Sequence, residues 1–224
     1  MATALRILSY NNISKEDRFV VTLKNPPQLT SSAVTMCIWT KPIVFSYIPI
    51  FGLFRDKTKL YLEDASDDGK SLYLRICGPC NAYNIDLSMS QRILPYFWVL
   101  ICLQIDVPRN LVRLYLNSEL IFEKYDKENM VHLDLEDNFL GFGIRINGAE
   151  ANRTGLQVWS TILDAENILQ MYKCGKSYPE PDVLNWNDVE FDVKPKTNNI
   201  IMYFATFDKQ LVSPSHPSKV PCYR

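Results

Sequence analysis

The sequence predicts an all-β protein that carries one short α-helix, and three observations support this fold class. Short segments in which apolar and polar residues alternate recur along the chain. Residues that favour turns separate these segments, as in Asp67-Asp68-Gly69 and Gly78-Pro79. Between residues 163 and 173, apolar residues recur at helical spacing instead.

The predicted strands are short and follow one another closely. In the segment 33–40, alternate residues share one face, and a tight turn at Asn117-Ser118 is expected to divide the segment 111–122. The predicted strands, in chain order, are 19–23, 33–40, 60–62, 71–76, 84–87, 98–106, 111–122 and 200–207.

The segment 156–193 constrains the fold most tightly. A strand is expected to end at Trp159, and three residues that favour a helix start follow it: Ser160, Thr161 and Asp164. The helix should end near Cys174 and Gly175. Trp186 is then expected to open another strand, whose apolar face would carry Val189, Phe191 and Val193.

Length and composition limit the domain organisation and the partners. A chain of 224 residues can bury one large core, so we expect a single domain with a tail. The 24 basic and 25 acidic side chains give no bias toward nucleic acid or anionic membranes. Gln104 interrupts the longest apolar run, at 95–105, so no segment is expected to insert into a membrane.

Cysteines and glycosylation sequons point to an oxidising compartment. The six cysteines are an even number, as expected of disulfide-bonded secreted proteins. Sequons at Asn12 and Asn152 predict N-linked glycans. The first residues do not form a signal peptide, so we expect a leader that is trimmed or absent from this sequence. The chain is predicted to be secreted or to belong to an extracellular domain.

The tetrapeptide Cys77-Gly-Pro-Cys80 is similar to the active-site motif of thioredoxins, and two interpretations compete. A redox site would place the first thiolate at a helix amino terminus. Here a predicted strand precedes the motif and alternating residues follow it. The sequence therefore favours a structural disulfide between Cys77 and Cys80.

Three other kinds of site find little support. Glu190 and Asp192 lie at alternate positions of a predicted strand, as glycosidase carboxylates do, but no further acid follows. His132 and His216 are too few for a His-rich zinc site. The acidic turn residues are expected to be solvated, namely Glu63, Asp64, Asp67, Asp68, Asp134, Glu136 and Asp137. We predict no enzyme activity, no metal and no cofactor.

Several colinear motifs resemble the pentraxin family, within the wider group of concanavalin A-like and laminin G-like domains. Phe45-Ser46-Tyr47 is similar to a family signature, and Trp98 and Cys102 have the family's spacing of Trp and Cys. Asn117-Ser118 stands where the family has an Asp/Asn-Gly turn.

The carboxy-terminal block carries the most specific part of this resemblance. Residues 159–172 resemble the family's terminal helix, and Leu184-Asn185-Trp186 resembles its closing strand. The resemblance covers a domain at 18–193, which leaves a lead-in at 1–17 and a Pro- and Ser-rich tail, with one strand, at 194–224.

The resemblance implies a jelly roll, in which two antiparallel sheets pack face to face over one core. It also implies a disulfide between Cys37 and Cys102. Cys174 and Cys222 would then form a further bond that ties the tail to the end of the helix.

Pentraxins bind ligands through a paired calcium site, which needs about six to eight oxygen ligands. In this chain the loop after Leu140-Gly141 carries a single carboxylate, Glu150, and the acid and amide pair expected soon after Tyr47 is absent. We therefore predict no calcium site of the family type.

These expectations lead to a non-catalytic, lectin-like recognition module that binds a glycan or a protein partner. An aromatic patch of Tyr47, Phe51, Phe54 and Tyr61 is one surface to consider, although core positions suit these residues better. The resemblance also allows an oligomer, because pentraxins often assemble into rings. The alternative is a structural domain of a larger receptor or matrix protein.

Overall fold

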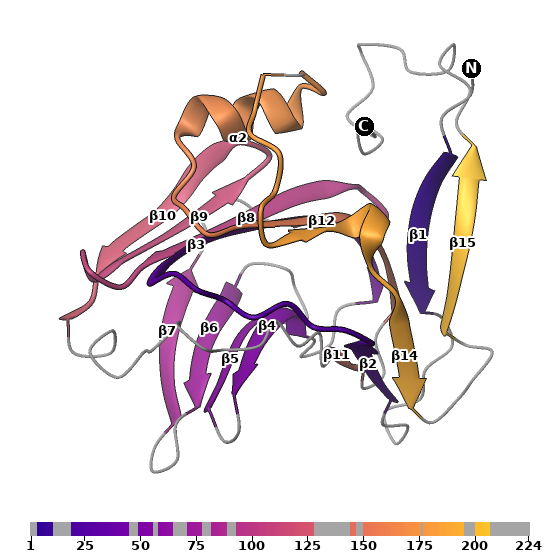
Figure 1. The fold of residues 1–224 in the computed structure, drawn as a ribbon, viewed down its shortest axis with the longest axis horizontal. Coiled ribbons are helices and arrows are strands. Elements are labelled where there is room, and N and C mark those ends of the chain that lie inside the picture. The colour runs from indigo at the N-terminus through magenta and orange to yellow at the C-terminus, as the bar shows by residue number, and fades with distance from the viewer. Residues whose placement is uncertain are drawn as a thin grey trace.

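Two layers of antiparallel strands and one helix build the fold (Figure 1). The predicted fold class, an all-β sandwich with one short helix, is confirmed. This computed structural model describes residues 4–10, 19–44, 49–55, 58–64, 71–77, 82–88, 93–127, 144–146, 150–175, 177–194 and 200–206.

The larger sheet has eight strands in the order β10-β9-β8-β3-β12-β1-β15, and β13 pairs with β12 beside this path. Its strands are β1 (Ala4–Tyr10), β3 (Ala33–Val44), β8 (Val99–Asp106), β9 (Leu111–Leu116), β10 (Glu119–Tyr125), β12 (Glu150–Trp159), β13 (Leu184–Asn185) and β15 (Ile200–Thr206).

The second layer contains seven strands in two pieces. One piece has the order β4-β5-β6-β7 and the other β11-β2-β14, and β11 lies next to β4. In Figure 1 these strands lie below the larger sheet. Their bounds are β2 (Phe19–Leu23), β4 (Pro49–Arg55), β5 (Thr58–Asp64), β6 (Ser71–Cys77), β7 (Ala82–Ser88), β11 (Ile144–Ile146) and β14 (Phe191–Lys194).

The main core lies between the two layers. Val34, Met36 and Ile38 of β3 point into it, which confirms the alternation expected of this strand. From the second layer, Leu62 and Leu74 contribute fully buried side chains. Face-to-face packing of this kind is the main source of stability in a β-sandwich.

A second core lies on the opposite face of the larger sheet, beneath the helix α2 (Ala165–Tyr172). The Asp164 carboxylate caps the helix by accepting a hydrogen bond of 2.7 Å from the Asn167 backbone N–H. Ile168 and Met171 face the sheet and are buried there. Both faces of β8 are covered as a result, and all eight of its residues are buried.

Most of the predicted strands are present, and several are longer than expected. Three strands had no counterpart in the sequence analysis: β1 within the lead-in, β4 and β11. β1 pairs with β12 and β15 inside the larger sheet. Ile7, Leu8 and Ser9 are buried in succession, so β1 has no alternating polar face that would have revealed it.

The prediction that Trp186 opens a strand is wrong. Trp186 begins a short 3-10 turn, η1 (Trp186–Asp188), and the strand starts at Phe191. The side-chain oxygen of Asn185 accepts a hydrogen bond of 3.1 Å from the Asn187 backbone N–H, which favours the turn. Trp186 is nevertheless buried, with its ring centroid 5.1 Å from that of Phe191.

The predicted turn at Asn117-Ser118 is confirmed between β9 and β10. Both residues have left-handed backbone angles, with φ of 50° and 74°, as a two-residue hairpin turn requires. Asn117 is also bonded to β8, because its side-chain oxygen accepts a hydrogen bond of 3.1 Å from the Leu100 backbone N–H.

Replacing Ser118 by glycine is expected to stabilise the protein by about 1 kcal/mol, because a side chain in the left-handed region costs about 1–2 kcal/mol. Urea unfolding of the Ser118→Gly variant measures this gain. Ser118→Ala is the matched control, since it removes the hydroxyl and keeps the Cβ atom. Equal stability of the glycine and alanine variants would show that Ser118 is not strained.

Candidate functional site

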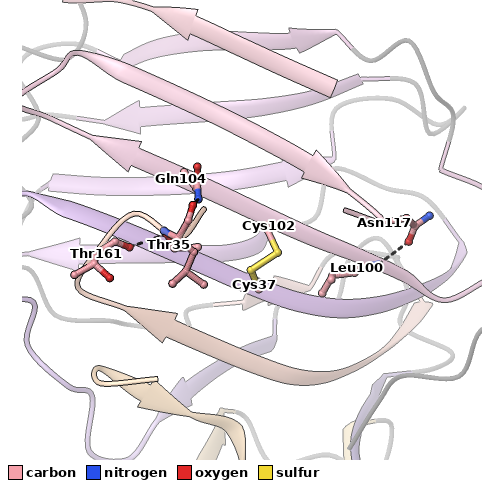
Figure 2. The surroundings of a disulfide bond; sticks show 8 residues. Thr35, Cys37, Leu100, Cys102, Gln104, Asn117 and Thr161 are labelled. Carbon is pink, nitrogen blue, oxygen red and sulfur yellow. Dashed lines mark hydrogen bonds between the residues drawn. A yellow bond between two sulfur atoms is a disulfide. The ribbon is translucent and has the colours of Figure 1, made fainter. Parts of the chain in front are cut away.

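The disulfide implied by the family resemblance is present between Cys37 and Cys102. The two cysteines lie directly opposite each other on β3 and β8, with their Cα atoms 4.1 Å apart (Figure 2). Both are fully buried in the second core, beneath α2. The burial and position of this disulfide indicate a structural role.

Polar groups beside the disulfide hold the segment that leads into α2 against the sheet (Figure 2). The Thr35 hydroxyl donates to the Thr161 carbonyl at 2.7 Å and accepts from the Leu163 backbone N–H at 3.0 Å. The Gln104 side-chain amide donates to the Leu163 carbonyl at 2.5 Å. These bonds fix where the helix starts.

The other predicted disulfides are only partly described. Cys174 follows α2 and is disulfide-bonded, but its partner sulfur is not among the described side chains. Cys80 and Cys222 lie outside the described residues, so the pairs 77–80 and 174–222 remain predictions. Cys77 is the last residue of β6, and the next described element is a strand, β7. A strand before and after the motif argues against the helical setting of a redox site.

The structure places the sequon residue Asn152 in the middle of the larger sheet. On β12 it lies between Ser9 of β1 and Lys41 of β3. Its side-chain oxygen is buried, and no described residue bonds to it. N-linked glycans need surface positions; Asn152 is half-buried, and a glycan there stays a prediction. The other sequon residue, Asn12, lies outside the described residues.

The described acidic residues do not form a metal-binding group. Glu190 forms an exposed ion pair of 2.9 Å with Lys24, and Asp192 lies on β14. Within the described ranges there is no group of three or more His, Cys, Asp or Glu side chains that could hold a metal. The description does not include the side chains of Glu63 and Asp64, either histidine, or the other acidic turn residues. It also leaves out residues 45–48, 128–143 and 147–149.

An apolar surface lies at the loop before β8. We define the aromatic loop as residues 93–98, in which Leu94, Tyr96 and Phe97 are 49%, 63% and 38% exposed. Val44, at the end of β3, is 43% exposed. Three large, mainly apolar side chains are therefore exposed within four residues, which makes this loop a candidate contact surface.

The backbone holds the aromatic loop in one shape. Tyr96 has a left-handed φ of 67°, and its N–H donates to the Pro42 carbonyl at 2.7 Å. Trp98 anchors the other side by packing on the second core. Strained backbone at an exposed aromatic residue is typical of functional loops, and a fixed loop loses little entropy when it binds a ligand.

The sequence analysis missed this loop and considered another aromatic patch instead. The side chains of Tyr47, Phe51, Phe54 and Tyr61 lie outside the described ones. A usable signal was the Pro95-Tyr96-Phe97 sequence immediately before a predicted strand, since Pro favours a turn at this point.

Comparisons with models of protein families and with curated protein sequences give no match. Among solved structures, a heptameric SAP-like pentraxin from Limulus polyphemus has a TM-score of 0.65 at 15% identity, over 88% of this chain and 94% of that chain. A putative carbohydrate-binding protein from Bacteroides ovatus has a TM-score of 0.55 at 13% identity, over 93% of this chain and 61% of the other.

The binding domain of botulinum neurotoxin serotype G is also similar, with a TM-score of 0.54 at 11% identity, over 74% of this chain and 44% of that domain. None of the helices in the described ranges has the length and apolarity needed to cross a membrane. At these identities the likeness concerns the fold. The chain therefore has a divergent pentraxin-like fold within the concanavalin A-like jelly rolls.

Proposed function

We propose that this chain is a non-catalytic recognition module that binds a glycan or a protein partner through the aromatic loop and without calcium. The exposed side chains of Leu94, Tyr96 and Phe97 on a fixed backbone are the observation that supports this function best. Tyrosine supplies large contact area and a hydrogen-bonding hydroxyl, which suits both kinds of partner.

The structural neighbours support recognition over catalysis. They include a pentraxin, a putative carbohydrate-binding protein and a neurotoxin binding domain. Fold alone does not determine function, so the main support for this function comes from the aromatic loop. The exposed aliphatic residues Leu94 and Val44 add apolar area of the kind that protein interfaces bury.

Calcium independence is supported by the sequence of the loops in which pentraxins hold calcium. The loop after Gly141 carries one carboxylate, Glu150, and the segment after Tyr47 carries none before Phe54. Calcium needs several carboxylates together with other oxygen ligands. Recognition in this protein would therefore rest on apolar contacts and hydrogen bonds.

An extracellular location is supported by the disulfide chemistry. The bond between Cys37 and Cys102 and the bonded state of Cys174 fit an oxidising compartment. Assembly into oligomers, as in the heptameric pentraxin, remains a second proposal, which analytical ultracentrifugation would test.

Substituting the aromatic loop tests the proposed function. The Tyr96→Ser/Phe97→Ser variant should bind its ligands about 30-fold more weakly, because the loss of two central aromatic contacts costs 2 kcal/mol or more. Binding is measured on arrays of immobilised glycans and extracellular protein domains, followed by surface plasmon resonance on the hits. Both side chains are exposed, so the melting temperature should stay unchanged.

The control is Lys124→Ser, which removes an exposed side chain at the far end of the larger sheet from the loop. At least one ligand should be lost by the loop variant and retained by this control. If every ligand binds the loop variant as tightly as the wild type, the aromatic loop is not the contact surface.

A further inference from the structure

The outer face of the larger sheet has an uncovered area beside α2. Tyr115 of β9 lies in the core beneath the helix, and Leu120 of β10 is its cross-strand neighbour. Arg113 and Glu123 form the next cross-strand pair on the same face, followed by Tyr125. We define the β9–β10 platform as Arg113, Leu120, Glu123 and Tyr125.

The platform presents an aromatic ring beside a charged pair. Tyr125 is 67% exposed and Leu120 is 44% exposed. The Arg113 Nε–H donates to the Glu123 carboxylate at 2.5 Å, and the two side chains are 29% and 37% exposed. All four side chains are therefore accessible to a ligand.

The charged pair keeps hydrogen-bonding capacity for a ligand. A guanidinium has five N–H donors, and a carboxylate has two oxygens. Within the described part of the chain, Glu123 is the only hydrogen-bond partner of the Arg113 side chain, and it is bonded through Oε2. The terminal nitrogens of Arg113 and the Oε1 atom of Glu123 remain available.

The surroundings of Arg113 keep its guanidinium charged, and those of Tyr115 keep its hydroxyl neutral. The hydrogen bond to Glu123 raises the pKa of Arg113 against the opposing effect of burial, so the guanidinium stays charged. Burial raises the pKa of Tyr115, which lies beside Arg113 on β9. Its hydroxyl therefore stays protonated across the physiological range.

A buried acceptor lies next to this pair. Gln104 of β8 is the cross-strand partner of Arg113 on its other side. Its Nε2 atom is bonded to the Leu163 carbonyl, but its buried Oε1 atom has no hydrogen-bond partner among the described residues. A buried acceptor of this kind is usually satisfied by an ordered water, so the environment beneath the charged pair is polar.

We propose that the β9–β10 platform binds a neutral saccharide, at a site separate from the aromatic loop. An apolar face of the sugar ring would stack on Tyr125. One hydroxyl would donate to Glu123 Oε1, and its neighbour would accept from the terminal nitrogens of Arg113.

Charge favours a neutral sugar over an anionic one. Glu123 balances Arg113, so the charged pair has no net charge. A sulfated or sialylated glycan would gain no net attraction and would bring its negative charge close to the Glu123 carboxylate. A protein surface would have to bury the charged pair, and its desolvation is costly. A saccharide can replace the water around these groups with its own hydroxyls.

Saturation-transfer NMR and calorimetry on the full chain test this site. The probes are neutral tetrasaccharides of β-linked glucose, α-linked mannose and β-linked galactose, with sialyllactose and a heparin tetrasaccharide as anionic counterparts. We expect binding of at least one neutral probe, and dissociation constants raised about tenfold or more by Tyr125→Ala and by Glu123→Gln. Tyr125 is exposed, so Tyr125→Ala should keep the wild-type melting temperature.

The control is Lys24→Ala, which truncates an exposed side chain next to β2 in the second layer and should leave saccharide binding unchanged. Three results would overturn the platform: no saturation transfer from any neutral probe at millimolar concentration, tighter binding of the anionic probes, or loss of binding in Tyr96→Ala with retention in Tyr125→Ala. The last of these would leave the proposed function of the aromatic loop intact.

Discussion

Replacing both cysteines of the Cys37–Cys102 bond by alanine is expected to lower the free energy of unfolding by about 4 kcal/mol. The bond joins residues 65 apart in the sequence, and crosslinks that close loops of this length restrict the unfolded chain strongly. Both sulfurs are fully buried, so their loss also leaves a cavity beneath α2. Urea unfolding under oxidising conditions measures the change.

Cys77→Ala/Cys80→Ala is the matched control for this prediction. A bond between these two residues would close a loop of only a few residues, so its removal should cost much less. A non-reducing peptide map should recover residues 37 and 102 in one linked fragment. Free thiols at both positions, or equal losses of stability in the two variants, would contradict the structural role of this bond.

Truncating Trp159 to alanine is expected to cost about 3–5 kcal/mol. Trp159 is 1% exposed and lies in the second core with Leu163 and Ile168, so it joins α2 to the sheet. Its indole N–H donates to the Pro179 carbonyl at 3.1 Å, and its ring meets that of Tyr178 edge-on. Denaturant unfolding measures the loss, and near-UV circular dichroism should show weaker tryptophan bands.

Trp159→Phe is the control that separates packing from hydrogen bonding. Phenylalanine fills most of the space and removes the bond to the Pro179 carbonyl, so a loss of about 1–2 kcal/mol is expected. A small loss for Trp159→Ala would mean that the helix does not depend on this contact. A loss for Trp159→Phe as large as for alanine would assign the effect to the hydrogen bond.

Local signals account for the parts of the fold that the sequence predicts well. The Asp164 cap and the Asn117-Ser118 turn depend on neighbouring residues in the chain, so their residue types suffice to locate them. β1 escaped prediction because both of its faces are covered. Trp186 is a residue type that is common in strands, but the side chain of Asn185 favours a 3-10 turn at this position.

The functional surfaces were harder to predict, because exposure is a property of the assembled fold. Tyr96 and Phe97 resemble core residues in the sequence, and only the sheet arrangement leaves them exposed. The Asn152 sequon shows the converse, since a motif typical of surfaces lies on a central strand. The pairing of Arg113 with Glu123 depends on the register of β9 and β10, which is shifted after Leu120.

Binding measured in calcium and in EDTA tests calcium-independent recognition by the aromatic loop most directly. Wild type and the Tyr96→Ser/Phe97→Ser variant are compared on the same immobilised ligands in both buffers. We expect equal wild-type binding with calcium and with EDTA, and a similar loss for the variant in each. Wild-type binding that disappears in EDTA, or a loop variant that binds as tightly as the wild type, would contradict this mode of recognition.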